Sequence, residues 1–292
     1  MVRLQCSDEL QDKVIRSLTD RDHFICEMLY EHRVLTTDQI CDLAFDNPTT
    51  ARHRLSLLWK LRLVDRFRPR RDVGSAPAHY VLDELGAAVV AAARGLEREE
   101  LAWRRARVLA IATSRRLPHL LGVNQFFCAL ARTARRNPDA ELLEWWSERR
   151  CLAEWDGFVR PDGYGRWREG SAEIAFFLEH DRGTERLARV AAKLDGYAEL
   201  ALSGEPVLVL FAFASRGRER EARMALRSAG VSVATAVVDR QTAAEGPIWS
   251  PLGSTGRRRL VQLGSDRRQG PGVWPWLTQQ PVETGKSDPS GI

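Results

Sequence analysis

Residues 47–67 read NPTTARHRLSLLWKLRLVDRF, and this stretch decides the fold expected for the first part of the chain. Pro48 suits the first turn of a helix. After it comes an apolar stripe at helical spacing, made of Ala51, Leu55, Leu58 and Leu61. The residues from 63 to 67 then alternate as a strand does. We therefore predict a helix over residues 48–62, followed directly by a strand.

The face of this helix opposite the stripe is basic. Between Thr49 and Arg71 the sequence has eight arginines and lysines but one acidic residue, Asp65. A solvated helix with a structural role usually mixes both signs of charge, whereas a surface of one sign is favoured by a duplex through the release of counterions. The alternative is an ordinary solvated face whose arginines reflect a GC-rich genome.

The flanking segments complete a winged helix-turn-helix, expected over residues 18–95. A first helix opens at Thr19, a second at Thr36 and Thr37, and the basic helix is the third. A loop rich in Arg, Gly and Pro over 68–78 leads to a returning strand over 79–82 and a helix over 84–93. The residues expected to contact DNA on this helix and wing are Thr49, Thr50, Arg52, His53, Ser56, Lys60, Arg66, Arg68, Arg70 and Arg71.

A basic helical connector is expected over residues 96–117, and a second α/β domain over 118–262. Its predicted order is a helix over 120–135, strands around 142–146 and ending at 158–162, a turn over 163–170, and a buried strand over 174–179. A helix from 183 or 184 to 202, a strand over 206–213, a helix over 218–229 and a strand over 231–238 follow. This is the core order of the PD-(D/E)xK, or restriction-endonuclease-like, fold.

That fold brings an Asp and a Glu from successive strands together on Mg²⁺, with a lysine nearby that activates water. Asp162 and Glu179 fill the carboxylate positions, and both are the candidate metal ligands. Asp181 stands where the lysine belongs, so Lys193 on the next helix is the candidate replacement. The alternative is a degenerate fold in which these acids organise structure without cutting DNA.

Composition excludes several other classes of protein. The chain has 292 residues, a formal net charge of +5, and five scattered cysteines without a Cys-x-x-Cys pair, so a disulfide framework or a thiolate zinc site is not expected. Walker, Gly-x-Ser-x-Gly and His-Glu-x-x-His motifs are absent. No apolar run is long enough for a membrane span, and the first residues lack a signal-peptide core. We expect a cytoplasmic protein with no membrane partner and a flexible tail over 263–292.

Several short motifs together resemble the replication-relaxation family, actinobacterial proteins linked to plasmid replication and plasmid DNA relaxation. The matching segments are LTTDQI (35–40), TARHRL (50–55), LVDRFRP (63–69), GSAP (74–77), HYVL (79–82) and FLEHDRGT (177–184). The resemblance spans roughly residues 18–262 and implies a DNA-linked role on mobile elements.

The first hypothesis is a double-stranded-DNA-binding protein that reads DNA with its winged helix. The second is a Mg²⁺-dependent nuclease or nickase that uses Asp162 and Glu179, and a third is a transcriptional regulator with the same DNA-reading surface. Double-stranded DNA is the expected partner, with a second copy of the chain or other replication or transfer proteins as further candidates. Mg²⁺ is the candidate cofactor.

Overall fold

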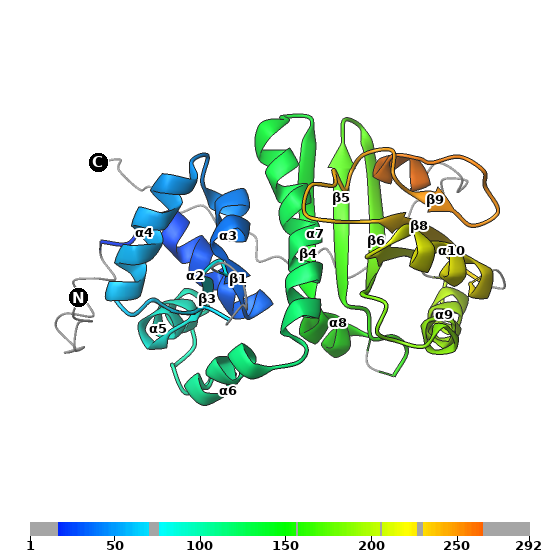
Figure 1. The fold of residues 1–292 in the computed structure, drawn as a ribbon. Coiled ribbons are helices and arrows are strands. Elements are labelled where there is room, and N and C mark those ends of the chain that lie inside the picture. Colours follow the sequence, from blue (N-terminus) through cyan, green and yellow to red (C-terminus); the bar gives the residue numbers. More distant parts are fainter. Residues whose placement is uncertain (1–16, 70–75, 156, 205, 227–229, 265–292) are drawn as a thin grey trace, which may run out of the picture.

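The chain forms two sheets surrounded by helices (Figure 1). The structure is a computed structural model, and it describes residues 17–69, 76–155, 157–204, 206–226 and 230–264. A three-stranded sheet belongs to the N-terminal part, and a six-stranded sheet belongs to the C-terminal part. The predicted α/β class is therefore confirmed. In the described residues, no helix is both long enough and apolar enough to cross a bilayer.

The N-terminal part begins with three helices, each started by a polar residue. Thr19 donates its backbone N–H to the Asp22 carboxylate, Thr36 accepts from the amide of the third helical residue, and Asn47 accepts from two amides. Such caps satisfy amides that have no partner inside the helix. The elements are α2 (Asp20–His32), β1 (Leu35–Thr36), α3 (Thr37–Ala44), α4 (Pro48–Lys60), β2 (Val64–Phe67), β3 (His79–Leu82) and α5 (Glu84–Ala93).

Helix α4 has one buried side, as its apolar stripe predicts. The side chains of Ala51, Leu55 and Leu58 are fully buried in the N-terminal core. Leu61, which was predicted for the same stripe, is only half-buried because it caps the C-terminal end of the helix. Strands β2 and β3 pair antiparallel, as predicted. Strand β1 joins β3 on its other side, but its two residues are too few to show an alternation in the sequence.

Helix α7 (Leu117–Arg136) lies between the two sheets and holds the two parts together (Figure 1). The side-chain amide of Asn124 donates to the carbonyl of Val34 at 2.8 Å, and that of Gln39 on α3 donates to the carbonyl of Leu121 at 2.9 Å. The connector before α7 contains α6 (Arg105–Leu109) and the short 3-10 helix η1 (Ala110–Thr113). Helix α7 covers the predicted helix over 120–135 and begins three residues earlier, with Pro118 in its first turn.

The six strands of the larger sheet follow one another in chain order, β4-β5-β6-β7-β8-β9. Strands β6, β7 and β8 run parallel, and the other neighbouring pairs run antiparallel. Helix α7 and η2 pack on one face of the sheet, and α8, α9 and α10 pack on the other. The bounds are β4 (Ala140–Ser147), α8 (Glu148–Glu154), β5 (Gly163–Glu169), β6 (Ala172–Asp181), α9 (Leu187–Leu202), β7 (Leu208–Phe213), α10 (Arg216–Ala225), β8 (Ser232–Val237), β9 (Ser250–Pro251) and η2 (Leu260–Gly264).

Two predicted segments of this domain are wrong. Residues 158–162, predicted as the end of a strand, belong to no strand, and α8 (Glu148–Glu154) precedes them. Residues 163–170 were predicted as a turn after a strand that ends at Asp162, but Gly163–Glu169 is itself the strand β5 and Asp162 precedes it. The glycines suggested a turn, yet they serve to make room for aromatic rings. A Cβ atom on Gly165 would lie 2.7 Å from ring atoms of both Phe127 and Phe176. Close packing explains these glycines better than turn geometry does.

Two smaller boundaries also differ from the prediction. Helix α9 begins at Leu187, three residues later than Thr184, because residues 182–184 form an exposed turn that includes Gly183 at a positive φ of 82°. The tail was predicted from 263, but η2 continues to Gly264 and Leu263 is buried. Residues from 265 onward lie outside the described part of the chain.

Candidate functional site

The residues predicted to contact DNA lie on one side of α4 and on β2. Thr49, Thr50, Arg52 and His53 are exposed, and Ser56 and Lys60 are half-buried. Arg66 on β2 and Arg68 after it are exposed as well. We call these eight residues the α4 surface. Two further predicted contacts, Arg70 and Arg71, lie outside the described residues.

The fold divides the basic residues of this region into two groups. Arg54 and Arg62 have carboxylate partners: Arg54 Nε donates to Asp22 Oδ1 at 2.8 Å, and Arg62 forms an ion pair with Glu84. In contrast, the side chains of Arg52, Lys60 and Arg68 form no ion pair or hydrogen bond with any described residue. The free cations therefore belong to the α4 surface, and the paired ones belong to the scaffold.

Two further contacts keep the α4 surface positive and ordered. Asp65, the acidic residue of this region, lies 3.2 Å from Arg105 Nη2, so its charge is compensated from another helix. The guanidinium carbon of Arg66 lies over the Trp59 ring, 4.4 Å from its centroid. Helix α4 lies on the side of the N-terminal part that faces away from the six-stranded sheet (Figure 1). The six-stranded sheet and the helices packed on it therefore do not cover this surface.

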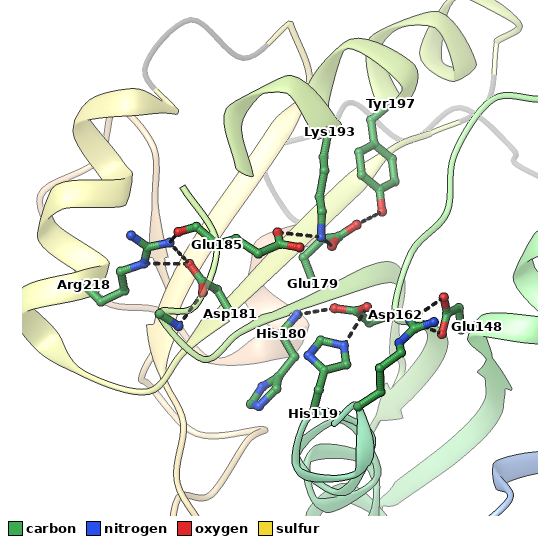
Figure 2. Close-up of polar contacts among 12 residues, drawn as sticks. His119, Glu148, Asp162, Glu179, His180, Asp181, Glu185, Lys193, Tyr197 and Arg218 are labelled. Carbon is green, nitrogen blue, oxygen red and sulfur yellow. Dashed lines mark hydrogen bonds and ion pairs between the residues drawn. The ribbon is translucent and has the colours of Figure 1, made fainter. Parts of the chain in front are cut away.

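A second group of charged residues gathers at the end of β6, beside α7 and α9 (Figure 2). It borders a cavity of about 630 Å³, which we call the cleft. The cleft is lined by Arg115, Arg116, His119, Glu148, Arg160, Asp162, Glu179, His180, Asp181, Arg182, Thr184, Glu185, Arg189, Val190, Lys193 and Phe211. The three predicted site residues, Asp162, Glu179 and Lys193, therefore meet in one place.

The directions of these side chains follow from the alternation along β6. Successive residues of a strand point to opposite faces of the sheet. Phe177 packs against α9, so Glu179 points to the same face and reaches that helix. His180 points to the other face, toward α7, where a Cβ on Gly122 would collide with its ring. Gly122 thus leaves the space that the His180 ring occupies.

Glu179 is held by two side chains of α9. Its carboxylate is only 2 % exposed; one oxygen lies 2.7 Å from Lys193 Nζ, and the other accepts a hydrogen bond from the Tyr197 hydroxyl at 2.7 Å. Burial and then the negative charge of Asp162 raise the pKa of Glu179 to about 7. Burial alone would lower the pKa of Lys193, but the charges of Glu179 and Asp162 outweigh it and raise that pKa.

Asp162 is held by the other side of the cleft. Its Oδ1 lies 2.9 Å from His119 Nε2, and its Oδ2 accepts a hydrogen bond from the backbone N–H of His180 at 2.8 Å. Burial by itself would raise the pKa of Asp162. The hydrogen bond and the charge of His119 outweigh this effect, so the pKa of Asp162 lies below its ordinary value. Burial and then the charge of His119 lower the pKa of His180 to about 4.

Asp181 does not take the role of the expected lysine. Its carboxylate accepts from Arg218 Nε at 2.8 Å and lies at the start of the turn after β6. The ammonium group near Glu179 comes instead from Lys193, nearly two turns into α9. Sequence reasoning missed His119 entirely, because nothing near it in the chain marks it as a partner of Asp162.

The cleft offers few donors for the Mg²⁺ ion that the sequence predicts. Within the described ranges, no group of three or more His, Cys, Asp and Glu residues is arranged to hold a metal ion. Asp162 and Glu179 still provide two carboxylates at one cavity, and each oxygen keeps a lone pair beside its present hydrogen bond. Mg²⁺ is commonly held by one or two carboxylates plus water and substrate phosphate. The pair therefore supplies at most two of the oxygen ligands that a bound Mg²⁺ ion needs.

Comparison with known proteins gives one match. A family model described as replication-relaxation matches residues 27–206, which is more than half of the chain. The matched range includes Arg52 on the α4 surface and Asp162, Glu179 and Lys193 in the cleft. It supports a role connected with replication. No curated protein and no solved structure shows significant similarity to the chain.

Proposed function

Because the chain belongs to the replication-relaxation family, we propose that it is a double-stranded-DNA-binding protein that reads its site with a winged helix-turn-helix. In this proposal α3 and α4 form the helix-turn-helix, and strands β2 and β3 belong to the wing. Helix α4 enters the major groove, and the wing contacts the phosphate backbone.

One observation carries this proposal: the cations of the α4 surface have no acidic partners among the described residues, although the protein supplies partners to other arginines of the same segment. Arg54, two residues from Arg52, is paired with a fully buried Asp22. Unpaired cations on one surface repel one another, and a duplex removes that repulsion while its own counterions are released. The pattern therefore suits a polyanionic ligand better than a solvated structural helix.

The residue types also suit the assigned roles. An arginine such as Arg52 can bind the O6 and N7 atoms of guanine through its two-pronged guanidinium group, and Ser56 suits contacts to either purine. Thr49 and Thr50, at the N-terminal end of α4, place exposed side-chain hydroxyl groups where a phosphate is favoured by the helix dipole. Arg68 contributes to backbone contacts as part of the wing.

The test is duplex binding by the Arg52→Ala/Lys60→Ala variant. We expect its affinity at moderate salt to fall at least about tenfold, because two phosphate or base contacts are lost. The matched control is Arg136→Ala/Arg216→Ala, which removes two exposed arginines far from α4 in sequence. Gel-shift titrations that give equal affinities for wild type and the Arg52/Lys60 variant would remove α4 from the DNA interface.

A second candidate function is metal-dependent DNA cleavage, and the meeting of Asp162, Glu179 and Lys193 at one cleft favours it. Asp162 and Glu179 would hold Mg²⁺, which would supply charge stabilisation at the phosphate and a more acidic water. Lys193 would orient that water, while Tyr197 and His119 keep the two carboxylates in place.

Incubation of supercoiled plasmid with Mg²⁺ or Mn²⁺ tests this second function. We expect conversion to nicked circles by wild type and none by Asp162→Ala or Glu179→Ala. Glu148→Ala is the control, because this acid lines the same cleft but is paired with Arg116. If no metal supports nicking, the cleavage function is wrong. Nicking that persists in both carboxylate variants would point to a contaminating nuclease.

A further inference from the structure

The cleft is lined by four arginines that belong neither to the α4 surface nor to the ion pairs of Asp162 and Glu179. Arg115 comes just before α7, Arg160 just before β5, Arg182 from the turn after β6, and Arg189 from α9. All four are exposed, and their side chains form no ion pair or hydrogen bond with any residue in the described ranges. Four separate segments thus direct free guanidinium groups to one cavity.

The acidic residues of the cleft only partly compensate these arginines, because most of the acids contact other basic groups. Glu148 lies 2.8 Å from Arg116, and Asp181 lies 2.7 Å from Arg218. Lys193 lies 2.7 Å from Glu179 and 3.7 Å from Glu185, and Asp162 is bound by His119. Lys193 contacts two acids, but the cavity is still lined by six arginines and lysines and by five carboxylates, so the positive charges are in excess.

The cleft also contains a polar atom without a partner. Nδ1 of His180 is buried and has no hydrogen-bond partner among the described residues. The neutral imidazole has one ring nitrogen that can donate a hydrogen bond. Because this nitrogen is not exposed, the groups that can contact a ligand directly are the exposed guanidinium groups.

We propose that the cleft binds the phosphate groups of a nucleic acid backbone through Arg115, Arg160, Arg182 and Arg189. The guanidinium group binds phosphate with two parallel hydrogen bonds, and a spread of four such groups suits successive phosphates of one strand. The inference rests on the proposed DNA-binding function and adds a second contact, separate from the α4 surface. It requires no metal, since the cations come from the protein itself.

The test compares two triple variants without metal, in the presence of EDTA. The cleft variant, Arg160→Ala/Arg182→Ala/Arg189→Ala, removes three of the four arginines. The control variant, Arg136→Ala/Arg216→Ala/Arg220→Ala, removes the same charge from exposed arginines outside the cleft. Both are measured by fluorescence anisotropy on a labelled duplex and on a labelled single strand of the same sequence, over a range of salt concentrations. Circular dichroism melting shows whether each variant folds as wild type does.

We expect the cleft variant to lose at least about tenfold in affinity, and its slope of log affinity against log salt to decrease by about 0.9 per lost contact on duplex or about 0.7 on a single strand. The probe that shows the decrease identifies whether the cleft takes duplex or single strand. Replacing the same three arginines with lysine should restore most of the affinity, because the charge returns.

Equal binding of both probes by the cleft variant and its control would overturn the inference. The Arg52→Ala/Lys60→Ala variant, measured beside them, separates this failure from failure of the proposed function. Loss of affinity in the cleft variant alone supports the inference and removes α4 from the interface. Loss in the α4 variant alone leaves the DNA-reading proposal intact and overturns the inference. A wild-type protein that binds neither probe overturns both.

Discussion

The α4 surface and the cleft are both rich in arginine, but they differ in where their acidic residues lie. Around α4 the acids lie beneath the surface, where Asp22 and Asp83 pair with arginines of the scaffold. In the cleft the acids form the floor: Glu179 is buried at the end of β6, and Asp162 lies opposite it. The same composition therefore gives an outward-facing basic surface in one region and a charged cavity in the other.

This difference separates two kinds of electrostatic site. On the α4 surface the cations are exposed to water, so their effect is long-ranged, sensitive to salt, and suited to attracting a polyanion. In the cleft the Asp162 and Glu179 carboxylates are largely removed from water, and the negative charge of Asp162 raises the pKa of Glu179. Perturbed pKa values in a cavity are typical of sites where a ligand or a proton is handled.

The largest effect is expected from removing a scaffold arginine. Arg54→Met should destabilise the protein by about 3–5 kcal/mol, because it leaves the fully buried Asp22 without its cation. Arg52→Met is the control, since Arg52 is exposed and has no partner in the described residues, and it should change stability by less than about 0.5 kcal/mol. Chemical denaturation measures both, and equal destabilisation would show that the division into paired and free cations is wrong.

The next largest effect is expected in the cleft. Lys193→Met should cost about 2–3 kcal/mol at pH 8, because the buried Glu179 loses its cation but keeps Tyr197. The cost should shrink at pH 6. A carboxyl group with a folded-state pKa near 7 is protonated there, and its neutral form gains little from a lysine.

Denaturation of wild type and Lys193→Met at the two pH values measures this change. Between the unfolded pKa of a glutamate and its raised folded pKa, the folded state binds more protons, so stability falls as pH rises. In the variant this fall should be steeper and should extend to higher pH. A cost that is independent of pH would mean that Glu179 does not titrate in this range. Arg189→Met, on the same helix, is the control.

An intermediate effect concerns the contact between the N-terminal part and the C-terminal part of the chain. His32 of α2 is buried and stacks on Trp145 of β4, with a centroid separation of 3.6 Å. Burial lowers the pKa of His32 to about 3, from an ordinary value near 6.5. The unfolded chain therefore takes up a proton below pH 6.5 that the folded chain refuses, and stability falls as pH falls. At pH 5.5 this loss should be about 1.4 kcal/mol.

His32→Phe keeps a ring on Trp145 but has no proton to gain. We expect the variant to lose about 1.4 kcal/mol less than wild type between pH 7.5 and pH 5.5, measured by thermal unfolding. Comparison of the two chains cancels the contributions of other groups, including that of His180. Identical pH dependence in both would show that His32 is protonated in the folded protein.

The smallest effect is expected from the stacked pair on the α4 surface. Trp59→Leu removes the ring beneath Arg66 and should lower stability by about 0.5–1 kcal/mol. Its duplex affinity should fall less than that of Arg52→Ala/Lys60→Ala, because Arg66 keeps its charge. Phe24→Leu, at an exposed position of α2, is the control for loss of an aromatic side chain. A larger loss of affinity than in the double variant would assign Trp59 a direct contact with DNA.

The fold was predictable where local signals agree. Thr36, Asn47 and Pro48 mark helix starts, and the spacing of Ala51, Leu55 and Leu58 sets the buried face of α4. Prediction failed at Gly163 and Gly165, because glycine is permissive in turns and also necessary where rings crowd a strand. The sequence alone does not distinguish these uses, since the crowding rings of Phe127 and Phe176 come from distant segments.

The candidate site divides in the same way. Asp162, Glu179 and Lys193 were predictable as a set because their order along the chain matches a known arrangement of strands and helix. His119 and the four free arginines of the cleft were not predictable, since each comes from a different segment and none has a local pattern.

The sequence by itself determined the helix starts, the apolar stripe of α4 and the excess of positive charge, because caps, periodicity and charge depend on residues within a few positions of one another. Tertiary structure decided which cations are free and which carboxylates are buried together. Arg52 and Arg54 are near neighbours in the chain, but packing of α2 beneath α4 gives a buried carboxylate to one and leaves the other exposed. Ion pairs and pKa values depend on distance and solvent exposure, and only the folded chain fixes these.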